Sequence, residues 1–186
     1  MDTIPQYVRL DTAAGPDASA SGQAAPLRLL LPVDATERSR WSIAYVMSLQ
    51  RCKTPIEAHL LFVAEPITNL HVLRFRTRAD LAAFQRQYGQ QQLDDAVAPL
   101  RRSGIPVRAH YREGNIAFEI VDCAEQAGCD RIVLPQPYPR WMRLLNGDVV
   151  RDVLDRSASV PVVTVDRHGV AQSDPSATAA ETRRSA

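Results

Sequence analysis

The chain of 186 residues lacks the features that mark membrane, secreted and nucleic-acid-binding proteins. No apolar run approaches the ~20 residues that cross a bilayer. The N-terminus has no basic start followed by an apolar stretch, so no secretory signal is expected. The 22 basic and 21 acidic residues leave a net charge of +1, which provides no global attraction to nucleic acid or to an acidic membrane surface. We therefore expect neither nucleic acid nor a membrane as partner.

Patterns of metal, redox and catalytic sites are also missing. An odd number of cysteines with no C-x-x-C pair, in a chain without a signal, indicates reduced thiols and a cytoplasmic location; they are Cys52, Cys123 and Cys129. The histidines show no ligand spacing, so we expect no metal, and His59 and His110 are predicted to be structural residues of strands. No serine has a convincing partner base. We assign no catalytic residues and expect no enzyme.

The composition divides the chain into three parts. Hydrophobic residues make up 45% of the chain, enough for a proper core. Residues 1–25 are rich in Ala, Ser, Gly, Asp and Pro and predict a flexible extension, and residues 167–186 predict a disordered tail. Core-building patterns are confined to residues 26–166, which we expect to form one domain.

Short apolar strands alternate with amphipathic helices through this domain. The strands are predicted at Leu27–Val33, Glu57–Val63, Pro106–Tyr111, Arg131–Leu134 and Val160–Val165. The helices between them are predicted at Glu37–Arg51, Arg78–Ser103, from Asn115 to Gly128, and Asp148–Ser157. Such a βαβαβαβαβ order predicts an α/β fold, a five-stranded parallel sheet with helices on both faces.

The first strand ends on a carboxylate, in the sequence PLRLLLPVD from Pro26 to Asp34. A nearly unbroken apolar run is typical of a fully buried parallel strand. Ligands of open α/β sheets bind beyond the carboxyl ends of the strands, so Asp34 stands where a site would lie. The alternative is that Asp34 caps the next helix or anchors a turn, and we favour it slightly.

Four segments in order resemble the universal stress protein family. They are LLLPVDATERS at 29–39, IEAHLLFVAEP at 56–66, REGNIAFEIVDCAEQAGCDRIVLP at 112–135 and NGDVVRDVLDRSASVPVVTV at 146–165. The resemblance implies an adenine-nucleotide-alpha-hydrolase-like, Rossmann-like sandwich with strand order 3-2-1-4-5, in which Asp34 and Pro135 face each other across a crevice. It also implies a homodimer whose fifth strands pair antiparallel through Pro161, Val162, Val163, Thr164 and Val165.

The loop after the fourth strand departs from the nucleotide-binding branch of that family. That branch carries G-x-x-G, nine residues and then G-[ST], whose glycines let the backbone approach phosphates. Here Pro135 replaces the first glycine, prolines remove further N–H donors, and Asp148 follows Gly147 where a serine or threonine is expected. Asp148 would place a carboxylate beside the anion. ATP binding of the usual kind is therefore predicted to be lost, and no cofactor is expected.

Candidate ligand-binding residues line both predicted walls of the crevice: Pro32, Val33, Asp34, Ala35, Leu134, Pro135, Gln136, Arg140, Arg143, Gly147, Asp148 and Val149. Arg140 and Arg143 keep a second hypothesis open. Their guanidinium groups could hold a phosphate in place of the missing amides. The chain would then bind ATP or another adenine nucleotide.

The sequence thus predicts a non-catalytic, stress-response regulatory homodimer. Besides nucleotide binding, two further functions stay open. An enzyme would need an activated nucleophile or a metal, and neither is visible. An adaptor would bind an unidentified protein partner through the arginines of residues 67–78 and through Trp141 and Met142.

Overall fold

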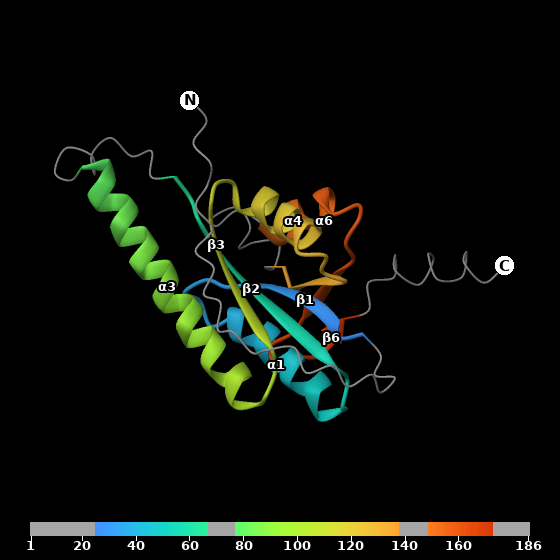
Figure 1. Cartoon of the computed structure of the whole chain (residues 1–186). Helices are drawn as coiled ribbons and strands as arrows, with labels where there is room; N and C mark the ends of the chain where they lie inside the picture. Colours follow the sequence, from blue (N-terminus) through green and yellow to red (C-terminus); the bar gives the residue numbers. More distant parts are fainter. Residues whose placement is uncertain (1–24, 67–76, 138–148, 173–186) are drawn as a thin grey trace.

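A computed structural model describes residues 25–66, 77–137 and 149–172 of the chain. These residues form a three-layered α/β sandwich (Figure 1). The strands are β1 (Leu27–Pro32), β2 (Ile56–Ala64), β3 (Val107–Glu113), β4 (Arg131–Pro135), β5 (Val162–Val165) and β6 (Ala171–Gln172). The helices are α1 (Ser39–Arg51), α3 (Arg78–Arg102), α4 (Ile116–Gln126) and α6 (Val149–Arg156). The predicted alternation and the predicted α/β class are confirmed.

The sheet has the order β3-β2-β1-β4-β5-β6, which confirms the predicted 3-2-1-4-5. The first five strands are parallel because a helix-containing crossover joins each to the next. In the register of the central strands, Leu30 lies opposite His59 of β2 and Ile132 of β4. From β1 the chain adds β2 and β3 on one side of the sheet, and then β4 and β5 on the other side of β1. The boundary between β1 and β4 is therefore the topological switch point.

Two cores lie on opposite faces of the sheet. Leu29 and Leu31 of β1 point into the core beneath α1 and α3, where they are 0% and 1% exposed. Leu30 points to the other face, into the core beneath α4 and α6. Successive residues of a strand face opposite sides. The apolar run of β1 is therefore buried on both faces of the sheet, as predicted. Figure 1 shows the two pairs of helices on either side of the sheet.

Local signals define the ends of the helices as predicted. Thr77 caps α3, and its hydroxyl and the Asp80 carboxylate form a reciprocal capping box. Asn115 caps α4, where its side-chain oxygen accepts from the Phe118 amide at 3.0 Å. Gly128 follows this helix with φ +62°, a conformation that glycine adopts without strain. Within the described ranges, no helix is long and apolar enough to cross a bilayer.

The C-terminal segment differs from the prediction. A sixth strand, β6, pairs antiparallel with β5, so that Gln172 lies opposite Thr164 and Ala171 opposite Val165. The predicted five strands are therefore one too few, and the prediction of a disordered tail over 167–186 is wrong for residues 167–172. The signal was present in Asp166 and Gly169, whose turn brings the chain back onto the sheet.

Candidate functional site at the ends of β1 and β4

The carboxyl ends of β1 and β4 lie side by side. Leu29 pairs with Arg131 and Leu30 with Ile132, so continuing the register brings Val33 beside Pro135. The segments that follow leave toward opposite faces, since α1 packs on one core and α6 on the other. A crevice at such a switch point is the usual ligand position in open α/β sheets. The two strand ends between which the sequence places the candidate site are therefore adjacent.

The Asp34 carboxylate is engaged in the turn that leads into α1. Its Oδ1 accepts from the Thr36 amide at 2.9 Å, the Thr36 hydroxyl at 2.7 Å and the Ser39 hydroxyl at 2.5 Å. The Asp34 amide in turn donates to Ser39 Oγ at 2.8 Å. These bonds form an Asx-type turn, which agrees with the turn-anchoring alternative. The pattern Asp-x-Thr-x-x-Ser is the signal for it.

Arg38 spans the crevice, and sequence reasoning missed it. Its guanidinium donates to the backbone carbonyl of Gln136, just beyond β4. The same guanidinium lies over the Trp41 ring, 5.2 Å from the ring centroid. An arginine directly before a helix is unremarkable in a sequence. Only the neighbouring position of β4 gives it a bridging role.

The remaining predicted residues divide by wall and by burial. On the β1 wall, Pro32 is half-buried, Val33 is buried and donates to the Leu61 carbonyl at 2.8 Å, and Ala35 is exposed. On the β4 wall, Leu134 is buried in the α4/α6 core, and Pro135 and Gln136 are half-buried. These residues lie at the adjacent carboxyl ends of β1 and β4, and Arg38 joins the two ends through the Gln136 carbonyl.

Of the predicted site residues in the loop and helix after β4, the structure describes Val149. Val149 begins α6 and packs on the α4/α6 core, so its side chain contributes to folding. Four other predicted site residues fall outside the described residues: Arg140, Arg143, Gly147 and Asp148. Their contacts with the crevice stay predictions. Trp141 and Met142 of the adaptor hypothesis also fall outside the described residues.

α1 is held onto β4 by a buried hydroxyl. Ser42 is 0% exposed, and its Oγ donates to the Val133 carbonyl at 3.3 Å. On the same helix Tyr45 is buried and Trp41 is half-buried against the α1/α3 core. Trp41 and Tyr45 of α1 therefore pack within the subunit.

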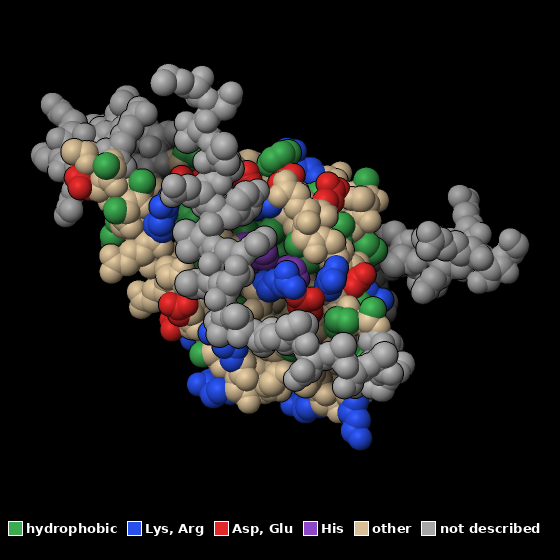
Figure 2. All heavy atoms as spheres, viewed as in Figure 1, with side chains coloured by type: hydrophobic (Ala, Val, Ile, Leu, Met, Phe, Trp, Pro, Cys, Tyr) green, Lys and Arg blue, Asp and Glu red, His purple; other side chains and the backbone are tan. Residues whose placement is uncertain are grey.

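A histidine pair lies on the other half of the sheet. His59 Nδ1 and His110 Nε2 are 3.1 Å apart, and His59 Nε2 is 3.6 Å from the Glu57 carboxylate. Burial lowers the pKa of both histidines, that of His110 to about 4. Figure 2 shows histidine side chains reaching the surface beside basic and acidic ones. Arg108 and Arg28 bind the same Glu57 at 2.6 and 3.3 Å.

This pair connects two strands by a hydrogen bond, in keeping with its predicted structural role. Across residues 25–66, 77–137 and 149–172, no group of three His, Cys, Asp or Glu side chains is arranged to hold a metal ion.

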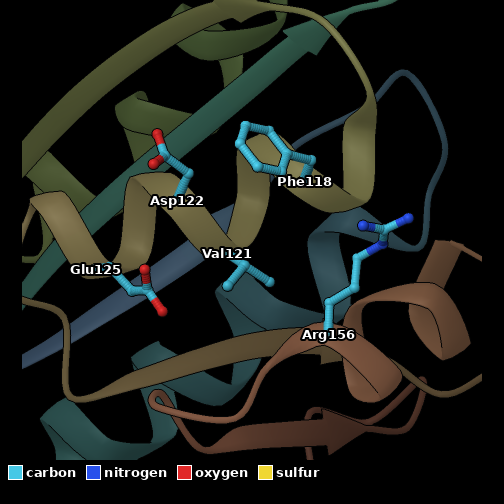
Figure 3. A pocket seen from close by; sticks show the side chains of 5 residues that line it. All are labelled: Phe118, Val121, Asp122, Glu125 and Arg156. Atoms are coloured by element: carbon cyan, nitrogen blue, oxygen red, sulfur yellow. The ribbon is translucent and has the colours of Figure 1, made fainter.

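An open hollow of about 260 Å³ lies away from the crevice. Phe118, Val121, Asp122 and Glu125 of α4 line it together with Arg156 of α6 (Figure 3). Phe118 is 54% exposed, and Asp122 is already engaged by Arg112. The hollow is a surface groove between two helices and has no connection with Asp34 or Pro135.

The fold and the crevice together define a doubly wound α/β protein with its candidate site at the topological switch point. Residues 27–166 match the model of the universal stress protein family. The chain belongs to this family. A search of curated proteins finds no match to it.

Solved structures of universal stress proteins share the fold. One from Burkholderia pseudomallei is 20% identical with a TM-score of 0.55 and covers 74% of this chain and 94% of its own. One from Archaeoglobus fulgidus is 18% identical, with a TM-score of 0.54 and coverage of 75% and 93%. One from Arabidopsis thaliana with AMP bound is 18% identical, with a TM-score of 0.51 and coverage of 76% and 92%. At these identities the likeness concerns the fold.

Proposed function

We propose that this chain is a non-catalytic, cytoplasmic stress-response regulator that acts as a homodimer and does not bind ATP in the family's usual way. Family membership supports the stress-response role. The absence of ATP binding rests on the groups at the crevice, and the dimer rests on the edge of β5.

The observation that carries the proposal is the bridge from Arg38 to the Gln136 carbonyl. It joins the residue before α1 to the segment after β4, and we infer that a nucleoside bound there would have to displace it. The Asp34 carboxylate, just beyond β1, already accepts three hydrogen bonds from Thr36 and Ser39. These bonds all reach Oδ1 and commit that oxygen to the turn, and Pro135 offers a nucleotide no amide.

Titration calorimetry with ATP, ADP and AMP at millimolar concentration tests this proposal. We expect no saturable heat from any of the three nucleotides. Arg38→Ala is the informative variant, since removing the bridge opens the crevice while the loop sequence stays unchanged. Saturable ATP binding by the wild-type chain would refute the proposal.

A nucleotide-binding function with a rewritten phosphate site is the second candidate. The Arabidopsis relative with AMP bound favours it, as does the cationic Arg38 at the crevice, because a guanidinium suits phosphate oxygens. In that case Arg140 and Arg143 replace the missing amides. Binding that Arg140→Ala weakens about tenfold or more, without loss of fold, would identify this function.

The proposed dimer uses the edge of β5, from Pro161 to Val165. The Ile132 amide donates to the Pro161 carbonyl and the Gln136 amide to the Val165 carbonyl. Because the backbone groups of alternate residues in a strand point to opposite sides, Val162 and Thr164 direct theirs to the outer edge. A second copy of β5 could pair with these groups through main-chain hydrogen bonds.

A further inference from the structure

The outer edge of β5 is already occupied by the chain's own β6. Thr164 and Val165 lie opposite Gln172 and Ala171 in an antiparallel pair. One turn further, the Asp166 amide donates to the Val170 carbonyl at 3.1 Å. Of the two residues with outward backbone groups, Val162 and Thr164, the second is therefore already paired within the subunit.

The hairpin turn is held by the Asp166 side chain. Its Oδ1 accepts from the His168 amide at 2.8 Å and from the Val170 amide at 3.0 Å. The Gly169 amide also donates to the Asp166 carbonyl at 3.0 Å. These bonds lower the pKa of the Asp166 carboxyl, chiefly through Val170, so the carboxylate stays charged and accepting at neutral pH.

The same turn is seated against α1. Gly169 has φ +70°, and a Cβ there would lie 2.7 Å from the Tyr45 amide nitrogen and 2.9 Å from the Ala44 carbonyl carbon. Only a residue without a side chain fits between the turn and the helix backbone. The hairpin is thus fixed at two places, on the edge of β5 and on α1.

We infer that the hairpin Asp166–Gln172 is an edge cap, and that β5 accepts either its own β6 or the β5 of a second copy of this chain. The two strands compete because they need the same outward groups of Thr164. A two-residue edge strand also offers little to any further strand, which is how natural sheets limit edge pairing. This inference rests on the proposed dimer and adds its regulation.

Gly169→Ala in the full chain tests the competition, with Gly104→Ala as the matched control. Gly104 has a similar φ of +73°, but a Cβ there would meet nothing within 4 Å. Both variants strain a left-handed residue, and only Gly169→Ala pushes the turn off α1. We expect its dimer dissociation constant, from sedimentation velocity, to fall about tenfold or more, since the apparent constant scales with the open fraction. Equal dimer dissociation constants for the two variants would contradict the inference that the contact of this turn with α1 regulates dimerisation.

Two shortened chains separate this inference from the dimer itself. One ends after Gln172 and keeps β6; the other ends after Asp166 and lacks it. We expect the longer one to match the full chain and the shorter one to dimerise about tenfold more tightly or better, and Val162→Pro to abolish that dimer by removing an outward N–H. Equal dimerisation of both would overturn the edge cap and leave the proposed dimer standing. Monomers throughout would refute the dimer as well.

Discussion

At the scale of a residue, Asp34 has one role indicated by the sequence and another observed in the structure. As the last residue of a buried strand it indicates a ligand site, yet its carboxylate accepts three bonds from the turn that follows. Both roles follow from the same position, because the end of a strand is where the chain turns and where the crevice opens. In the structure, the donors that bind this carboxylate belong to the turn.

Asp34→Ala should therefore destabilise the protein. The substitution leaves the Thr36 amide and hydroxyl and the Ser39 hydroxyl without their acceptor, and we expect a loss of about 1–2 kcal/mol in the free energy of unfolding. Urea denaturation measures it. Asp94→Ala is the control, since the exposed Asp94 accepts only the Gln90 side chain on one helix face, which contributes about 0.5 kcal/mol or less. Equal losses for the two variants would contradict the turn-anchoring role.

The histidine pair predicts a dependence of stability on pH. Burial lowers the folded-state pKa of His110 to about 4 and also lowers that of His59, from the ordinary histidine value of 6.5. The unfolded state therefore binds protons first, so stability is complete above pH 6.5 and falls as the pH drops from 6.5 toward 4. Glu57 opposes the shift of His59, while Arg108 and Arg28 enhance it and Arg112 enhances that of His110.

His110→Asn should flatten this slope. We expect the difference in unfolding free energy between pH 7.5 and 4.5 to shrink by about 1–2 kcal/mol, a value reduced for partial solvent screening. The exposed His168 provides the control variant His168→Asn, which should keep the wild-type slope. Identical slopes in the wild type and His110→Asn would show that the pair carries no proton linkage.

At the scale of elements, α4 illustrates which local predictions succeed. Asn115 and Gly128 mark its ends, and Ile120 and Ala124 form its inner stripe, at 1% and 0% exposed. Capping and periodicity depend on neighbours in the sequence, so they can be predicted without the fold. The bridging role of Arg38 could not be predicted, because its partner Gln136 lies 98 residues away.

The inner face of α4 and the turn after it also hide two thiols. Cys123 and Cys129 are 1% and 7% exposed, and burial raises their pKa to about 11 and about 12. Neither forms a thiolate near neutral pH, whereas Cys52 is exposed at the end of α1. We expect a disulfide reagent at pH 8 to modify Cys52 rapidly and the other two only on unfolding. Cys52→Ser should abolish the fast phase, and a second fast thiol in this variant would contradict the burial.

At the scale of the whole molecule, the sheet explains both the crevice and the limit on assembly. The order β3-β2-β1-β4-β5-β6 places β1 at the centre, so the ends of β1 and β4 meet at the switch point. The same order leaves β5 near the rim, where β6 pairs with it and where we propose that a second copy competes. The shortened chains and the Gly169→Ala variant therefore test a property of the sheet as a unit.

The sequence by itself determined the class of fold and the approximate helix boundaries, because hydrophobic periodicity and capping are local. The family resemblance implied the strand order from β1 to β5 and, with it, the predicted position of the crevice. The role of Asp34 in its own turn is also local, since its partners Thr36 and Ser39 lie within five residues. Only the tertiary structure decided that Arg38 reaches Gln136 and that β6 covers β5, because both contacts use backbone groups that the fold brings together and that have no signature in the sequence.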